Sequence, residues 1–115
     1  MPSAGQIVLF RFPQTDLVQG KLRPALLLCQ LPGPYSDWLV CMLSTQLRHY
    51  VEGFDEIIQV GDADFEASGL NATSVVRVGR LAVVEEDMLL GATGEIDEQR
   101  LERVKARLIT WLAQD

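Results

Sequence analysis

The sequence predicts a mainly β (α+β) domain, a small and strongly bent antiparallel sheet of about five to seven short strands followed by one helix. Two observations carry this prediction. Short runs of β-branched, aromatic and aliphatic residues alternate with proline, glycine and polar residues over most of the chain. Apolar side chains recur at helical spacing over residues 98–113. The 115 residues form one domain, residues 1–115, and curling its sheet removes edges that would otherwise pair with other chains.

Three strands are predicted in the first part of the chain, over residues 6–12, 24–30 and 37–43. Pro13 ends the first strand, and the polar residues 14–21 form a loop of the kind that often covers a site. The second and third strands have no polar face. A strand that is apolar on both sides is central or is covered by a second subunit, so this pattern predicts a homodimer.

Shorter elements are predicted in the second part of the chain: strands over residues 56–60, 74–78 and 81–84, and helical turns over residues 62–69 and 85–89. Gly79 and Arg80 separate the last two strands, and the glycine is a candidate for a bulge or bend. Gly91 and Gly94 flank a further turn.

The C-terminal helix is predicted over residues 98–113, with Asp97 as its N-cap. Its apolar stripe, which should pack on the sheet, comprises Leu101, Val104, Leu108 and either Trp111 or Leu112. The remaining face of the helix carries charges and should face solvent.

The N-terminal residues do not have the pattern of a signal peptide, and no apolar run is long enough to span a bilayer. A cytoplasmic protein without a membrane segment is therefore expected. Cys29 and Cys41 lie inside apolar runs, at a spacing that matches no metal motif. They are expected to be buried free thiols in a reducing compartment, and neither a metal nor a cofactor is expected.

The net charge of −6 argues against generic nucleic-acid binding, but the charges are unevenly distributed. Residues 1–50 carry four basic residues against two acidic ones, whereas residues 51–80 and 81–115 each carry a net charge of −4. An anionic substrate should therefore meet the first part of the chain.

Arg23 precedes Pro24 at the start of a predicted strand. Proline suits the first residue of a strand, and it pushes the preceding residue toward an extended backbone. The guanidinium should then be held at the mouth of a buried strand, where a cation can bind or stabilise negative charge. On these residues alone, a surface ion pair is the simpler interpretation.

Ser44, Thr45 and Gln46 follow the third strand and bring two hydroxyls and an amide to its end. They form either a polar site or a strand terminus capped by its own side chains. His49, the only histidine, is either a general base near that site or a solvated loop residue beside Arg48. The solvated residue is the simpler interpretation.

Taken in order, these segments resemble the MazF/PemK family, the toxins of type II toxin–antitoxin systems. Four pieces carry the resemblance: Gly5-Gln6-Ile7-Val8 with Phe12-Pro13, Leu22-Arg23-Pro24-Ala25, Leu43-Ser44-Thr45-Gln46, and Asp64-Phe65-Glu66-Ala67-Ser68-Gly69-Leu70 with Ser74-Val75-Val76-Arg77. The pieces span nearly the whole chain in the right order, and the C-terminal helix falls where the family has one.

The resemblance implies an SH3-like β-barrel, a homodimer, and a metal-independent endoribonuclease that cleaves single-stranded RNA. It also implies a protein partner, an antitoxin whose C-terminal tail, often acidic, blocks the RNA groove. By the family's motif, Arg23 and Ser44 are the catalytic pair, with Ser44 where threonine is usual. The candidate substrate-binding residues are Thr45, Gln46, Arg11, Lys21, Arg48, Arg77 and Arg80. Arg77 and Arg80 fit surface ion pairs equally well.

These residue types fit the chemistry that the resemblance implies. An RNA 2′-hydroxyl can attack its own neighbouring phosphate, so the enzyme need supply neither a nucleophile nor a metal. The enzyme must align the attack and stabilise charge on the phosphorane oxygens. A guanidinium can donate two parallel hydrogen bonds to phosphate, and a serine hydroxyl can donate a third.

Two other functions stay open. Thr73 and Gly79 stand where many family members carry acidic residues, and the chain is strongly acidic for an RNA-cutting protein. These departures fit a non-catalytic SH3-like module that binds a protein partner, as a degenerate toxin homologue would. A toxin that acts on a protein target such as gyrase is a further alternative. Convergence of Arg23 and Ser44 on one groove would favour the ribonuclease.

Overall fold

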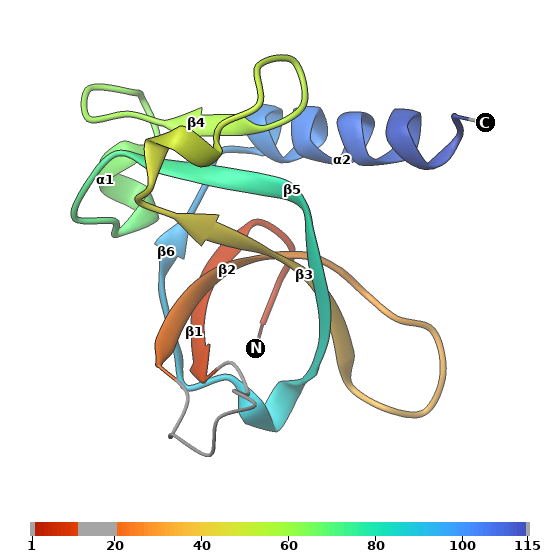
Figure 1. Cartoon of the computed structure of the whole chain (residues 1–115). Helices are drawn as coiled ribbons and strands as arrows, with labels where there is room; N and C mark the ends of the chain where they lie inside the picture. The colour runs from red at the N-terminus through yellow and green to blue at the C-terminus, as the bar shows by residue number, and fades with distance from the viewer. Residues whose placement is uncertain (1, 12–20, 115) are drawn as a thin grey trace.

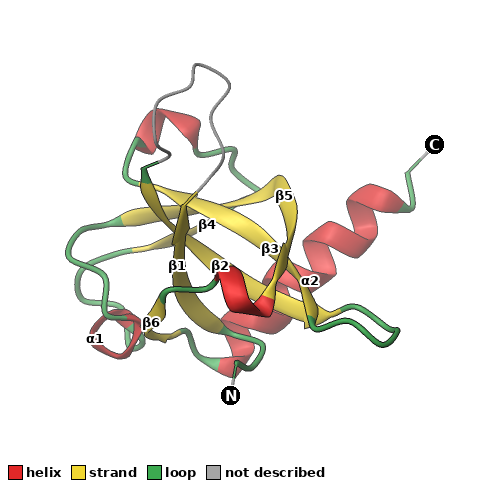
Figure 2. Ribbon diagram, turned by 90° about the horizontal axis from the view of Figure 1, so that it is seen from below, coloured by secondary structure: helices red, strands yellow, loops and turns green. Residues whose placement is uncertain are grey.

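The architecture is a curled antiparallel sheet with a C-terminal helix, seen in a computed structural model that describes residues 2–11 and 21–114 (Figures 1 and 2). The described strands are β1 (Gln6–Arg11), β2 (Leu22–Gln30), β3 (Asp37–Ser44), β4 (Glu56–Ile58), β5 (Ser74–Glu85) and β6 (Gly91–Glu95). The helical elements are α1 (Phe65–Ser68), α2 (Glu98–Leu112) and two 3-10 turns, η1 (Leu47–His49) and η2 (Glu86–Met88).

The strands form one sheet in the order β4-β5-β3-β2-β1-β6, and this sheet curls into a half-barrel (Figure 1). The predicted mainly β fold class with a C-terminal helix is therefore confirmed. The predicted end of the first strand at Phe12 and Pro13 lies outside the described residues, as does the predicted loop over residues 14–21 except for Lys21.

β2 and β3 are buried on both faces, because two apolar clusters form on opposite sides of the sheet. Leu26 and Cys41 belong to the cluster that α2 covers, whereas Leu27 and Val40 belong to the other, and all four are 0% exposed. Leu89, just after η2, packs against the second cluster. Each fully buried aliphatic side chain contributes about 1.5–3 kcal/mol. Of the two explanations for strands that are apolar on both sides, the central position is therefore the one observed, and these strands do not themselves require a second subunit.

α2 begins where the sequence predicted. A side-chain oxygen of Asp97 accepts a hydrogen bond from the backbone N–H of Arg100 at 2.7 Å. The side chains that α2 buries are Arg100, Val104 and Leu108. Trp111 and Leu112 are instead 42% and 66% exposed, because the end of α2 runs past the bend of β5 (Figure 1). The Trp111 ring packs edge-on against Phe54, with 5.4 Å between the ring centroids. No helix in the described part of the chain is long and apolar enough to cross a membrane.

β5 is one strand of 12 residues rather than the two strands predicted. Cys41 and Leu43 of β3 pair with Leu81 and Val76 of β5, so the four intervening residues of β5 lie opposite a single residue of β3. This bulge bends β5 sharply (Figure 1) and joins the two predicted segments. Gly79 lies within the bulge, as the sequence predicted for this glycine.

β6 replaces the turn that was predicted between Gly91 and Gly94. The segment pairs with β1 and forms one edge of the sheet. A Cβ atom on Gly94 would lie 1.9 Å from the carbonyl oxygen of Ala67, so α1 can approach this strand only where a glycine stands. The segment lacks apolar alternation, and its pairing is imposed by the tertiary structure rather than by its own residues.

The two free cysteines differ in exposure. Cys41 is buried, and burial, with a smaller effect from Asp55, raises the pKa of its thiol to about 12. Cys29 is exposed, which corrects the prediction that both thiols are buried. It lies beside a register shift of the β2–β3 ladder, near the end of β2, where the apolar clusters no longer cover the strand.

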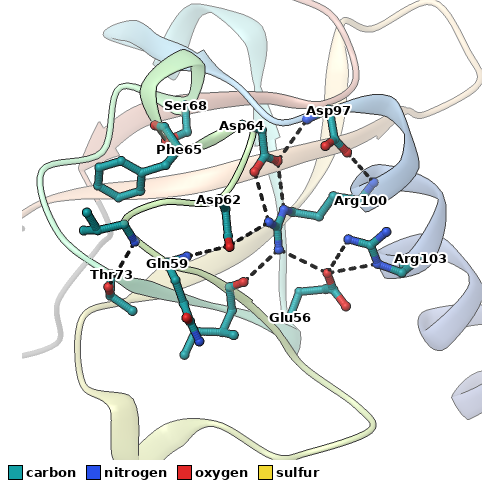
Figure 3. Close-up of polar contacts among 12 residues, drawn as sticks. Glu56, Gln59, Asp62, Asp64, Phe65, Ser68, Thr73, Asp97, Arg100 and Arg103 are labelled. Atoms are coloured by element: carbon teal, nitrogen blue, oxygen red, sulfur yellow. Dashed lines mark hydrogen bonds and ion pairs between the residues drawn. The ribbon is translucent and has the colours of Figure 1, made fainter.

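The guanidinium of Arg100 is buried between α2 and the acidic residues around β4 and α1 (Figure 3). Its Nε and Nη2 donate to the two carboxylate oxygens of Asp64 at 2.8 and 3.0 Å. Its Nη1 donates to Glu56 at 3.2 Å and to the carbonyl oxygen of Ile57 at 2.7 Å, and Nη2 also donates to Asp62 at 3.1 Å. Every nitrogen of the guanidinium therefore has a partner, and the hydrogen bonds from Arg100 hold the pKa of Asp64 below its ordinary value.

Two further arginines of α2 reach the same acidic residues. Arg103 donates to Glu56 from Nε and Nη2 at 3.2 and 3.1 Å. Arg107 lies 2.8 Å from the other oxygen of Glu56 and also donates to the carbonyl oxygen of Asp55. The Asp55 carboxylate in turn accepts a hydrogen bond from the backbone N–H of Val78 at 3.0 Å. α2 is therefore held on the sheet by charge as well as by apolar burial.

Replacing Arg100 with alanine should lower the free energy of unfolding by about 3–5 kcal/mol, because Asp64 and Glu56 would stay buried after losing the cation that they share. Arg103→Ala is the matched control. The Arg103 side chain is 48% exposed, and its loss should cost at most about 1 kcal/mol. Urea unfolding of both variants measures the difference. Equal losses would mean that the apolar stripe alone holds α2.

Candidate functional site

A groove of about 580 Å³ opens where β2 begins and β3 ends. The described residues that line it come from three strands and from the turn after β3. They are Leu22, Arg23 and Pro24 of β2; Met42, Leu43 and Ser44 of β3; Thr45, Gln46, Arg48 and His49 of the turn; and Arg77 and Arg80 of β5. An apolar set of side chains thus lies beside a set of hydroxyls, an amide, an imidazole and guanidinium groups.

The antiparallel sheet brings these segments together. The start of β2 lies beside the end of β3, with Ala25 opposite Met42. The end of β3 lies beside the first half of β5, with Ser44 opposite Val75. The bulge of β5 follows directly, and both groove arginines of β5 come from this bulge.

The groove brings together seven of the nine residues predicted for the site. Arg23 and Ser44 both line it, which is the arrangement expected of a catalytic pair. The other five are Thr45, Gln46, Arg48, Arg77 and Arg80. Arg11 and Lys21 do not line the groove. Both are exposed, and Arg11 pairs with the groove residue Leu22 in the β1–β2 ladder.

The hydroxyl of Ser44 is fixed by the turn that follows β3. Its Oγ accepts a hydrogen bond from the backbone N–H of Gln46 at 3.0 Å and lies 3.1 Å from Nδ1 of His49. η1 holds the histidine there, since the backbone N–H of His49 donates to the carbonyl oxygen of Gln46 at 3.0 Å. Arg48 donates to the side-chain oxygen of Gln46 at 2.6 Å. The strand end is thus capped by its own side chains and also presents them to the groove.

Among the described residues, the groove lining contains four arginines and no carboxylate. The four are Arg23, Arg48, Arg77 and Arg80. None of the ion pairs formed within residues 2–11 and 21–114 involves any of them. The molecule therefore concentrates positive charge in the groove, although its net charge is −6. In the same described residues, no group of three or more His, Cys, Asp or Glu side chains is placed to hold a metal ion.

His49 is the residue of the groove whose contacts the sequence did not reveal. Partial desolvation, followed by the charges of Arg77, Arg48 and Arg80, holds the pKa of His49 below its ordinary value of 6.5. The lowered pKa favours the neutral imidazole, which is the form that can take up a proton. Its contact with Ser44 exists because η1 folds the chain back over the end of β3, and no local pattern predicts this.

The family model that describes a PemK-like, MazF-like toxin of type II toxin–antitoxin systems matches residues 3–112. The chain belongs to this family. It is thus a toxin-type component of a type II toxin–antitoxin system, and the resemblance found in the sequence is confirmed. No curated protein matches the chain in sequence.

Solved structures share the fold of this PemK/MazF-family chain. An endoribonuclease in complex with its cognate antitoxin, from a mycobacterial species, is 18% identical over 100% of this chain and 98% of its own, with a TM-score of 0.65. MazF from Deinococcus radiodurans is 21% identical over 98% and 97% of the two chains, with a TM-score of 0.66. A MazE–MazF complex from the same organism is 18% identical over 99% and 98%, with a TM-score of 0.70.

The pKa of His49 should prove to lie below 6.5 and should rise toward that value in an Arg77→Gln variant, because one of the cations that face the ring is then removed. His49 is the only histidine, so its ring signals in an NMR titration are unambiguous. Lys105→Gln on α2 removes a cation outside the groove lining and should leave the titration unchanged. An unaltered pKa in Arg77→Gln would mean that Arg77 does not set it.

Proposed function

We propose that this toxin is an endoribonuclease that cleaves single-stranded RNA without a metal. One observation carries the proposal: Arg23 and Ser44 face one groove, and the described part of its lining holds four guanidinium groups and no carboxylate. A site of this kind attracts a polyanion and can stabilise additional negative charge as it develops.

Transesterification within RNA matches the groups that are present. The 2′-hydroxyl attacks the adjacent phosphorus, and the phosphorane that forms carries more negative charge on its oxygens than the ground state does. Arg23 would donate two parallel hydrogen bonds to these oxygens, and the Ser44 hydroxyl would donate a third. Both residues come from strand ends rather than from a long loop, so the sheet sets their backbone positions before the RNA binds.

The other groove residues would bind the strand on either side of the reacting phosphate. Arg48, Arg77 and Arg80 supply charge for neighbouring phosphates, and Thr45 and Gln46 supply polar contacts. Arg11 and Lys21 lie outside the lining, and we assign to them contacts with RNA that extends beyond the groove.

The partner that we propose is a cognate antitoxin with an acidic segment, acting in the cytoplasm where the RNA substrate is made. Two of the similar solved structures hold an antitoxin with the toxin. An acidic peptide would be attracted by the same arginines as RNA, and its binding would therefore block cleavage.

Arg23→Ala should reduce cleavage of a single-stranded RNA pool in EDTA by about 100- to 1,000-fold, because one preorganised donor to the developing charge is lost. The Arg23 side chain is exposed, so the melting temperature should not change. Arg23→Lys should restore cleavage only in part, since an ammonium lacks the planar fork. Ser44→Ala should reduce the cleavage rate less than Arg23→Ala does. Ser44→Thr should keep most of the cleavage activity because the hydroxyl remains.

Lys105→Ala on α2 is the matched control, because it removes a basic residue outside the groove lining and should leave cleavage unchanged. A folded, fully active Arg23→Ala protein would remove Arg23 from the mechanism. Failure of the wild-type protein to cleave any RNA in the pool would contradict the proposed activity and would favour a non-catalytic binding module.

We also propose that the chain forms a homodimer. Large apolar side chains remain exposed after folding, among them Leu22 and Leu47 at 46% and 51%, and Val83 and Leu90 at 53% and 60%. Covering them against a second copy would be favourable. Sedimentation at micromolar concentration should therefore give twice the mass of the chain. A single monomeric species under these conditions would contradict the dimer.

A further inference from the structure

We infer that His49 is the general base of the cleavage reaction and that its contact with Ser44 divides the work between the two side chains. The inference rests on the proposed ribonuclease function. It assigns removal of the 2′-hydroxyl proton to Nε2 of His49, and donation of a hydrogen bond to the phosphorane to the hydroxyl of Ser44.

The first step of the argument is the choice of groups that the groove offers. A base for this reaction must be able to hold and release a proton near neutral pH. Within residues 2–11 and 21–114, the lining contains no carboxylate, lysine, tyrosine or cysteine. A guanidinium group has no lone pair to accept a proton, and serine and threonine hydroxyls are too weakly basic. Among the described residues of the lining, His49 alone meets the requirement.

The second step is the hydrogen bonding around Ser44. Its Oγ already accepts a hydrogen bond from the backbone N–H of Gln46 at 3.0 Å, and it lies 3.1 Å from Nδ1 of His49. If Nδ1 carries the imidazole proton, it donates to the same oxygen and fills the second acceptor position of the hydroxyl. The hydroxyl proton of Ser44 is then free to point at a ligand, and Nε2 is left with its lone pair. This tautomer is the one in which both side chains can act on RNA.

The third step is the charge around the ring. Arg48 from η1, and Arg77 and Arg80 from β5, act on His49, and Arg23 from β2 lines the same groove. These cations favour the neutral imidazole, which is the form that a base needs before it reacts. A bound RNA phosphate would offset part of this positive charge. His49 should therefore be more basic in the RNA complex than in the free protein.

The proposed step is balanced in protons and electrons. The 2′-hydroxyl gives its proton to Nε2, and the electron pair of the 2′-oxygen forms the new bond to phosphorus. The bond from phosphorus to the 5′-oxygen breaks, its electron pair leaves with that oxygen, and the oxygen takes a proton from solvent. The products are a 2′,3′-cyclic phosphate and a 5′-hydroxyl end, and the imidazolium returns its proton to solvent.

His49→Asn is the decisive variant, because the asparagine amide can still donate a hydrogen bond to Ser44 but cannot accept the proton. Cleavage of a single-stranded RNA oligonucleotide by this variant should fall by about 100- to 10,000-fold. Cleavage by His49→Ala should fall at least as far, and added imidazole should restore part of the activity of this variant. Binding of an oligonucleotide with a 2′-deoxy sugar at the cleaved position should change little in either variant. Lys105→Gln serves as the unaffected control.

The pH dependence of the rate provides a second readout. In the wild-type protein, kcat/KM should decline on the acid side with a midpoint below pH 6.5, and the midpoint for kcat should lie at higher pH because RNA is then bound. His49→Asn and His49→Ala should lack this acid decline. A merely structural histidine would lower the rate without removing the decline.

The outcomes separate this inference from the function on which it rests. If the wild-type protein cleaves no RNA, the proposed ribonuclease function and the role of His49 as base are both overturned. If Arg23→Ala loses cleavage while His49→Asn keeps the wild-type rate or the acid decline, the ribonuclease stands and the role of His49 as base is overturned. Weakened binding of the 2′-deoxy oligonucleotide that accounts for the whole loss of rate would also overturn it, since His49 would then only bind RNA.

Discussion

The buried guanidinium of Arg100 is the interaction on which the rest of the structure depends. It joins α2 to β4 and to the segment before α1, which are far apart in sequence (Figure 3). Removing such a cation from water costs several kcal/mol. The cost is offset here because every nitrogen of the guanidinium donates a hydrogen bond, to the carboxylates of Asp64, Glu56 and Asp62 and to a backbone carbonyl. A helix docked in another register would leave these charges buried without partners. The network therefore selects one position for α2 on the sheet.

The acidic residues that bind the arginines of α2 also connect this helix, through β4 and β5, to the groove. Glu56 binds the arginines of α2 and also pairs with Val76 in the β4–β5 ladder. The carboxylate of Asp55 accepts the backbone N–H of Val78. Arg77 lies between these two anchored valines, and because side chains alternate along a strand it points away from the cluster that they enter. The direction in which this arginine enters the groove is thus set by the pairing of Val76 with β4 and by the hydrogen bond from Val78 to Asp55.

The sequence predicted the parts of the molecule that rest on local patterns. Apolar runs and the placement of proline were enough for the central strands, and the N-cap was evident at Asp97. The catalytic pair of the groove, in contrast, was predicted from the resemblance to the MazF/PemK family. β6 was missed because its position depends on the close approach of a carbonyl to Gly94. Arg100 was assigned to the charged face of the helix, since nothing near it in the sequence shows that acidic residues fold over it. The contact of His49 with Ser44 was left open because it requires the turn of η1.

The net charge of −6 is a poor guide to what the groove can bind, because charge acts locally. At physiological salt, electrostatic interactions are screened beyond about 8 Å, and several of the acids are already paired with the arginines of α2. An RNA strand near the groove would therefore meet an attractive potential on a molecule that repels RNA elsewhere. Under the proposed function, the arrangement would disfavour indiscriminate binding and would direct the strand to the groove. It would direct an acidic antitoxin segment to the same place, so the two ligands would exclude one another by competing for the same four arginines.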